Sequence, residues 1–227
     1  EQLTADGLRV YTALDPQIHR GLDEGRKNAL ARLEAINLDS RGEVQLGAIM
    51  VDIPTGEIQA ALAGRDHQLG FHRVLDARRQ IGSLVKPFVV AAAIEQDPRF
   101  HAGTLVRDDM ISIEDDRGNI WTPRNYDEKE LGVVRLESVV ASSINQATVH
   151  LAFGLGLDQI LDRLDNLGIP VGPTKPPATL LGVSEMSPYQ MAQRYQALLN
   201  QGYQASLKAV RTVVDDAGAV LTRRPFR

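Results

Sequence analysis

The sequence of 227 residues contains no cysteine, only one tryptophan and few aromatic residues of any kind. The lack of cysteine excludes a disulfide framework and a thiolate-bound metal ion. No window approaches the 18 apolar residues that predict a transmembrane helix. A net charge of −4, without any basic cluster, gives no reason to expect nucleic acid as a partner. A hydrophobic content of 43% is ordinary for a globular protein, so function has to be sought in particular polar side chains.

The order of the apolar patterns predicts an α+β fold. Strands are expected at residues 8–14, 44–51, 58–63, 211–214 and 220–221, where apolar runs are bounded by turn residues. Helices are expected from Asp15-Pro16 to about Asn37 and at 136–141, 147–153, 158–167 and 189–200. Residues 97–131 are irregular and read as loop. A sheet that begins early and resumes late predicts an antiparallel sheet covered by helices, with a large helical insertion.

The most informative stretch is residues 79–87, which read R-Q-I-G-S-L-V-K-P and lead into the apolar run 88–94. That run predicts a buried helix, and Pro87 places its start near Gly82–Ser83. Ser83 and Lys86 are three residues apart, so their side chains lie on one face. A hydroxyl at a helix N-terminus beside an amine in apolar surroundings is a plausible activated nucleophile. Burial disfavours the ammonium form, so the lysine can act as a base towards the hydroxyl. The competing interpretation is a serine cap and a lysine that reaches solvent.

A second pair, Ser143 and Asn145, lies between two predicted helices about 60 residues later. Taken alone, such residues are ordinary helix caps. Ser-x-x-Lys followed by Ser-x-Asn, however, resembles the motif set of penicillin-binding proteins and serine β-lactamases. Residues 70–87, 122–126 and 182–188 are similar to segments of the class A, or bifunctional, penicillin-binding proteins. The likeness runs in order from about Gly7 to the end of the chain.

The resemblance implies the penicillin-binding protein/serine β-lactamase fold and a peptidoglycan DD-transpeptidase. Ser83 is then the nucleophile that attacks the D-Ala–D-Ala carbonyl of a stem peptide, and Lys86 takes its proton. Ser143 relays a proton to the leaving amine, and Asn145 holds the substrate amide. Trp121 and Tyr126 are candidates for lining the groove of the stem peptide, although core contacts are an equal alternative for each. No cofactor is implied, and the histidines lack the spacing of metal ligands.

The family also implies an organisation beyond these residues. Residues 1–43 are expected to form an N-terminal strand and first helix, and residues 44–227 the transpeptidase domain. A glycosyltransferase domain and a membrane anchor are expected upstream, on the periplasmic or extracytoplasmic side of the cytoplasmic membrane. The expected partners are peptidoglycan stem peptides, β-lactam antibiotics and activators of cell-wall synthesis, with no nucleic acid.

One departure from the family pattern concerns its third motif, Lys-Thr-Gly, which normally lies on a strand beside the serine. None of the five lysines begins such a motif. The family pattern would place it after Arg227, so the chain reads as cut before its last strands; a natural loss is the alternative. The loss of one oxyanion donor costs on the order of 10²–10³ in rate.

Other activities share the same residues. A serine β-lactamase would use Ser83 and Lys86, but the class A enzymes usually carry Ser-Asp-Asn where this chain has Ile144. A DD-carboxypeptidase differs only in its acyl acceptor. A non-catalytic penicillin-binding sensor or pseudoenzyme is the remaining alternative.

Overall fold

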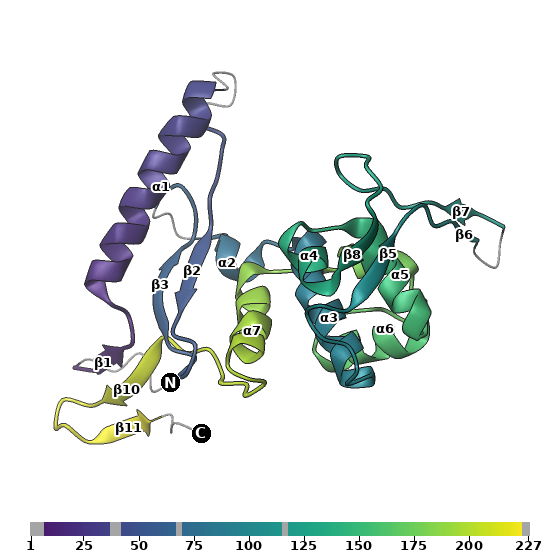
Figure 1. Cartoon of the computed structure of the whole chain (residues 1–227). Coiled ribbons are helices and arrows are strands. Elements are labelled where there is room, and N and C mark those ends of the chain that lie inside the picture. Colours follow the sequence, from purple (N-terminus) through teal and green to yellow (C-terminus); the bar gives the residue numbers. More distant parts are fainter. Residues whose placement is uncertain (1–6, 37–41, 67–69, 115–117, 224–227) are drawn as a thin grey trace. The chain divides into compact units, whose positions relative to one another are not determined.

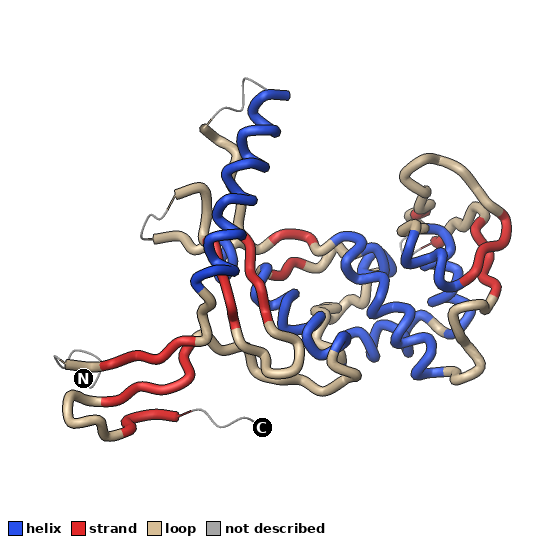
Figure 2. The backbone as a smooth tube through the Cα atoms, turned by 60° about the vertical axis from the view of Figure 1, so that its left-hand side comes forward, coloured by secondary structure: helices blue, strands red, loops and turns tan. Residues whose placement is uncertain are grey.

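The computed structural model describes residues 7–36, 42–66, 70–114 and 118–223, and divides into two compact units. The first unit comprises residues 1–78 and 186–227, and the second comprises residues 79–185 (Figure 1). In Figure 2, which shows helices in blue and strands in red, the first unit is rich in strands and the second is mainly helical. The helical unit is thus an insertion in the sequence of the strand-rich unit, as the sequence predicted.

The first unit is built on two antiparallel ladders. In one, β1 (Arg9–Thr12) pairs with β10 (Val210–Val214), which pairs with β11 (Val220–Arg223). In the other, β2 (Ala48–Val51) pairs with β3 (Ile58–Leu62). Val10 lies opposite Val213, so a strand from the start of the chain is joined to one from its end. The antiparallel α+β fold class is confirmed.

Helices pack on the β2–β3 ladder. The long helix α1 (Pro16–Ile36) and the short helix α2 (Arg73–Asp76) contact β3, and α7 (Pro188–Leu199) contacts β2. Helix α1 starts where the sequence predicts it, because the Asp15 carboxylate accepts hydrogen bonds from the backbone N–H groups of Gln17 and Ile18 at 2.7 and 3.1 Å. Ser187 and Gln190 form a capping box at the start of α7.

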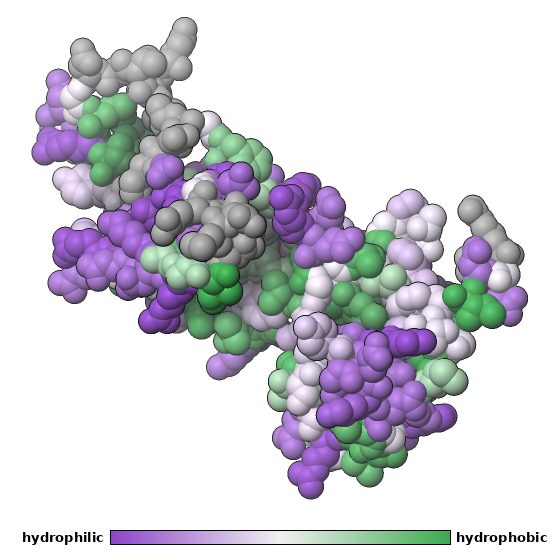
Figure 3. All heavy atoms as spheres, turned by 90° about the horizontal axis from the view of Figure 1, so that it is seen from above, coloured by the Kyte–Doolittle hydropathy of each residue, from purple (hydrophilic) through white to green (hydrophobic). Residues whose placement is uncertain are grey.

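The second unit is mainly helical, and its helices pack on one another. The 3₁₀ turn η3 (Gly82–Val85) runs into α3 (Lys86–Gln96), which packs against α4 (Leu136–Ala141), α5 (Asn145–Leu155) and α6 (Leu157–Asn166). A second 3₁₀ segment, η4 (Pro177–Leu181), packs against η3 and α5. The core side chains of α3, α5 and α6 include those of Phe88, Val89, Val149, Leu151, Ile160 and Leu164. Hydrophilic and hydrophobic side chains mix over the surface visible in Figure 3.

The segment expected to be irregular, residues 97–131, contains short strands that the sequence did not reveal. Strand β5 (Leu105–Asp108) pairs with β8 (Gly132–Arg135), and β6 (Ile113–Glu114) pairs with β7 (Ile120–Trp121). These ladders are too short to show a periodicity of two in the sequence. Strands β4 (Arg79–Gln80) and β9 (Glu185–Met186) lie where the division between the units falls. No helix among the described residues is long and apolar enough to cross a bilayer.

Candidate active site

Ser83 and Lys86 lie on consecutive elements of the second unit. Ser83 is in the first turn of η3, and Lys86 is the first residue of α3. Side chains three residues apart eclipse each other in a 3₁₀ turn, which aligns the two side chains. Ser83 is exposed, whereas Lys86 is only 1% exposed. This turn therefore places an accessible hydroxyl, that of Ser83, next to a buried amine, that of Lys86.

Two glycines fix the turn that carries Ser83. Gly82 has a φ of +53°, and Gly182 has a φ of +81°. The backbone N–H of Gly82 donates to the Gly182 carbonyl at 2.9 Å. A Cβ atom on Gly182 would lie 2.0 Å from the Gly82 carbonyl oxygen, so only glycine fits there. The two segments that the sequence marked separately, around Ser83 and around Gly182, are thus in direct contact.

Ser143 and Asn145 lie between α4 and α5, where the chain makes a tight turn. Ser143 has a φ of +54°, a left-handed conformation that is unfavourable for a residue other than glycine. The backbone N–H of Ile144 donates to the Val139 carbonyl at 3.0 Å and closes the turn. Such strain is stored most often at functional sites. From this turn the Ser143 hydroxyl reaches Ser83, to which it is hydrogen-bonded.

The four residues predicted to be catalytic lie in one hydrogen-bonded cluster. The Ser143 hydroxyl donates to Ser83 Oγ at 2.7 Å, and Lys86 Nζ donates to Ser143 Oγ at 2.9 Å. Lys86 Nζ also donates to the Ser143 carbonyl at 2.5 Å and to Asn145 Oδ1 at 2.6 Å. The Ser143 hydroxyl therefore joins the buried amine to the exposed serine.

The buried amine of Lys86 is surrounded by neutral groups. Its three acceptors are one carbonyl, one hydroxyl and one amide oxygen. Among the described ion pairs, none involves Lys86. Burial without a counter-ion lowers the pKa of Lys86 from its usual 10.5 to about 8. Roughly a tenth of such amines are uncharged at pH 7, which makes Lys86 able to accept a proton there.

Sequence reasoning missed a buried polar group next to this cluster. Asn125 Oδ1 accepts hydrogen bonds from the backbone N–H groups of Asn145 and Gln146 at 2.9 and 3.1 Å. Asn125 Nδ2 approaches the carboxylate of Asp108 at 2.8 Å and the side-chain oxygen of Gln146 at 2.9 Å. Asn125 lay in a segment noted only for family likeness. Asp108, at the end of β5, is fully buried, and no local sequence pattern indicates this.

The two aromatic candidates are placed differently. Trp121 ends the short strand β7 and is half-buried. Tyr126 follows Asn125 and is fully exposed, so the alternative of a core contact is wrong for Tyr126. Within the described residues, no side-chain hydrogen bond or ring contact links either aromatic residue to the serines or to Lys86. Their role in lining a groove stays a prediction.

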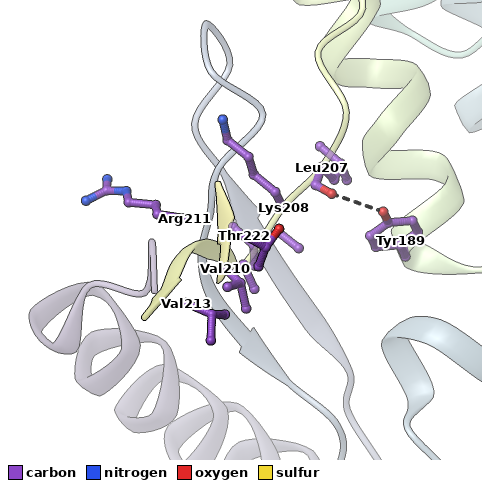
Figure 4. A pocket seen from close by; sticks show the side chains of 9 residues that line it. Tyr189, Leu207, Lys208, Val210, Arg211, Val213 and Thr222 are labelled. Atoms are coloured by element: carbon purple, nitrogen blue, oxygen red, sulfur yellow. Dashed lines mark hydrogen bonds between the residues drawn. The ribbon is translucent and has the colours of Figure 1, made fainter. Parts of the chain in front are cut away.

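Cavities occur in both units. A cavity of about 210 Å³ is lined by Arg124, Asn125 and Gln146, among others, and so lies beside the cluster. A larger cavity of about 450 Å³ lies in the first unit, where Tyr189 donates a hydrogen bond to the Leu207 carbonyl at 3.3 Å (Figure 4). Its lining combines aliphatic side chains, such as those of Ile58 and Val213, with the polar side chains of Lys208, Arg211 and Thr222. Among the described residues, no group of three or more acidic or histidine side chains is arranged to hold a metal ion.

Comparisons with known proteins identify the family of this chain. Residues 46–226 match the family model described as the penicillin-binding protein transpeptidase domain. The chain is 40% identical over 217 residues to penicillin-binding protein 1B of Vibrio cholerae, covering 95% of this chain and 28% of that protein. It is 31% identical over 220 residues to penicillin-binding protein 1B of Escherichia coli, covering 95% and 26%. The chain therefore spans about a quarter of the length of these relatives.

Solved structures show the same fold. The PonA1 protein of Mycobacterium tuberculosis in complex with penicillin V superposes with a TM-score of 0.77, at 23% sequence identity, covering 98% of this chain and 59% of that one. Penicillin-binding protein 1A of Haemophilus influenzae gives a TM-score of 0.73 at 24% identity, covering 79% and 27%. The penicillin-binding protein fold predicted from the motifs is confirmed.

Proposed function

The chain belongs to the penicillin-binding protein transpeptidase family, in its class A branch, and from this premise we propose that it is a serine-type D-Ala–D-Ala transpeptidase. Its substrates are the stem peptides of peptidoglycan, and β-lactams acylate the same serine. The observation that carries the proposal is the hydrogen-bonded chain from Ser83 through Ser143 to the buried Lys86.

In the first half-reaction, Ser83 Oγ attacks the carbonyl carbon of the penultimate D-alanine of a donor peptide. The Ser83 proton passes to Ser143 Oγ, while the Ser143 proton passes to the uncharged amine of Lys86. The tetrahedral intermediate then collapses and breaks the peptide bond. The departing D-alanine nitrogen receives a proton back through Ser143, which leaves an ester on Ser83 and a neutral Lys86.

In the second half-reaction, the amine of another stem peptide attacks the ester carbonyl. Its proton passes through Ser143 to Lys86, and the Ser83 oxygen leaves and is reprotonated by the same route. The products are a crosslinked peptide and free Ser83. Water in place of the amine would give a carboxypeptidase, and fast hydrolysis of a penicilloyl ester would give a β-lactamase.

Two further groups complete the proposed site. Ser83 lies in the first turn of η3, where backbone N–H groups have no partner within the helix, so its own N–H is one donor for the oxyanion. Asn145 Nδ2 lies on the exposed side of its amide and is the group we assign to the substrate amide. Trp121 and Tyr126 are the proposed groove residues.

The wider setting is also part of the proposal. By analogy with its class A relatives, the protein would act on the outer face of the cytoplasmic membrane, with a membrane anchor and a glycosyltransferase domain. Proteins that activate cell-wall synthesis would be its partners. We assign residues 44–227 to the transpeptidase domain and residues 1–43 to its lead-in.

The test is the intact mass of the protein after incubation with benzylpenicillin. We expect the wild type to gain the mass of one penicillin and to keep it for many minutes, because the bound ester excludes an amine acceptor. Ser83→Ala should gain nothing. Ser112→Ala, which removes another exposed hydroxyl of the same unit, should behave as the wild type.

The outcomes separate the alternatives. Rapid loss of the adduct would favour a β-lactamase, and an adduct that survives Ser83→Ala would contradict the assigned nucleophile. Both the 227-residue chain and the full-length gene product should be measured. Absence of an adduct in both would overturn the catalytic proposal, whereas an adduct without crosslinking by the full-length product would identify a sensor.

A further inference from the structure

Lys86 and Asn145 meet through one particular orientation of the Asn145 side-chain amide. Asn145 Nδ2 donates to the Arg124 carbonyl at 2.8 Å, which leaves Oδ1 to accept from Lys86 Nζ at 2.6 Å. The reverse orientation would place Nδ2 against the ammonium group and would leave two donors facing each other. The segment that contains Arg124 therefore sets which atom of Asn145 faces the lysine.

The main chain of Asn145 is fixed by the same segment. Asn125 Oδ1 accepts from the N–H groups of Asn145 and Gln146, which are the first two residues of α5. Helix N-terminal N–H groups lack partners within the helix, and here a side chain from a distant loop supplies one. Residues 124 and 125 thus hold Asn145 by its backbone and by its amide.

The cap itself is held by a buried carboxylate and by two neutral acceptors of Asn125 Nδ2, the Lys129 carbonyl at 2.7 Å and the Gln146 side-chain oxygen at 2.9 Å. Asp108 is 0% exposed and Asn125 is 8% exposed. Asp108 Oδ1 accepts from Asn125 Nδ2 at 2.8 Å, and Asp108 Oδ2 accepts from the backbone N–H of Leu131 at 3.0 Å. Among the described residues, no cation pairs with Asp108. A buried carboxylate with only neutral donors is costly, so the bonds that it makes are strongly directional.

We propose that Asn125, oriented by Asp108, is a positioning residue of the transfer reaction: it fixes Asn145 and, through Asn145 Oδ1, the amine of Lys86. This inference rests on the proposed function. Neither Asn125 nor Asp108 touches the serines. Their effect on the reaction is indirect, through the place of the proton acceptor relative to Ser143.

The orientation can be tested by exchanging the two side chains. Asn125→Asp brings two carboxylates together in a buried site, so the cap is repelled from Asp108. In the double variant Asp108→Asn/Asn125→Asp, the amide at 108 donates to the carboxylate at 125 and accepts from Leu131. The carboxylate at 125 still accepts from both N–H groups of α5, where negative charge is favourable. Its other oxygen replaces a donor to the Lys129 carbonyl and to the Gln146 side-chain oxygen, so we expect only part of the loss to be recovered.

We would measure acylation by a fluorescent penicillin in the full-length gene product, and separate the first-order acylation rate constant from the concentration giving half-saturation. Asn125→Asp should lower the rate constant on the order of 10²-fold, the loss expected when a reacting group is displaced by about 1 Å. Half-saturation should change far less, because Asn125 does not reach the ligand. The exchanged double variant should recover at least ~10-fold of that loss.

The matched control is Asn200→Asp, the same chemical change at a residue of the first unit whose amide donates to the Tyr203 carbonyl. It should acylate at the wild-type rate. Folded Asn125→Asp with a wild-type rate constant would overturn the inference. If Asn125→Asp does not fold, the exchanged double variant decides. A double variant that folds and is acylated supports the inference. A double variant that folds but is acylated as slowly as Lys86→Met overturns it. A wild type that is not acylated would instead refute the proposed function.

Discussion

The two units treat buried charge in opposite ways. In the first unit, Arg26 pairs with Asp23 at 2.6 Å, and Glu34 pairs with Arg65 at 2.5 Å. Glu57 accepts two hydrogen bonds from Arg211, at 2.9 and 2.5 Å. The Arg211 guanidinium lowers the pKa of the Glu57 carboxyl. The Asp23–Arg26 pair lies within α1, whereas the pairs of Glu34 with Arg65 and of Glu57 with Arg211 join segments that are far apart in the sequence.

In the second unit, the buried charged side chains are those of Lys86 and Asp108, and both are held by neutral groups. Burial of a charge without an opposite charge costs stability, and burial lowers the pKa of Lys86 to about 8. If the proposed function holds, the buried ionic groups of the first unit serve stability, whereas Lys86 of the second unit serves the reaction. Substitutions should therefore separate stability from reactivity along the same division.

The largest effect is expected for Lys86→Met, which keeps the length of the side chain but removes the proton acceptor. Acylation by penicillin should fall by about 10²–10⁴-fold, the usual contribution of a general base. The wild-type rate should rise with pH to a plateau, with a midpoint near pH 8, because burial lowers the pKa of Lys86 to about 8. Stopped-flow acylation from pH 6 to 10 measures both.

Lys27→Met makes the same change in the first unit, where Lys27 is exposed and pairs with Asp23. We expect no change in its acylation rate. A comparable loss of rate in both variants would contradict the division of roles between the units.

A smaller effect is expected on stability. The folded pKa of Lys86, about 8, lies below its unfolded value of 10.5. Between these pH values the unfolded chain binds more protons than the folded chain, so stability rises with pH. The wild type should therefore gain about 3 kcal/mol over Lys86→Met from pH 8 to 10.5. Urea unfolding of both proteins across this range gives the difference.

Glu57→Gln tests the other end of the pH scale, where the sign is the same: the stability that Glu57 contributes also rises with pH, because its folded pKa lies below its unfolded value. The pKa of Glu57 is lowered, so its contribution is present above pH 4.5 and is lost as the pH falls further. For the Lys86 prediction, a difference in the free energy of unfolding between the wild type and Lys86→Met that stays constant from pH 8 to 10.5 would show that the amine is not desolvated.

The sequence indicated the candidate site residues better than the residues that support them. Ser83, Lys86, Ser143 and Asn145 were singled out because their types and spacings resemble the motif set of a known family, and the structure brings them into one hydrogen-bonded cluster. The helix starts at Asp15 and Ser187 were found because caps act locally. In each case the signal lies within a few residues.

The supporting residues could not be found in this way, because their role depends on contacts across the fold. Asn125 acts on α5, which begins 20 residues later, and Asp108 is buried only once β5 pairs with β8. The pairing of β1 with β10 joins residues about 200 apart, and a single sequence gives no register for it. The positive φ of Ser143 likewise has no signature, because serine does not favour that conformation.

The smallest effect, and the sharpest test of strain at the site, is the comparison of Ser143→Gly with Ser143→Ala. Both variants remove the hydroxyl, so acylation should fall equally in both. At a φ of +54° only alanine has a Cβ penalty, and the glycine variant should be more stable by about 1 kcal/mol after the entropy of its unfolded chain is subtracted. At Ser142, with a φ of −102°, the same pair should show the reverse order in urea unfolding. If the alanine variant is the more stable one at both positions, the left-handed turn stores no strain, and the Ser143 hydroxyl reaches Ser83 at no cost to the stability of the fold.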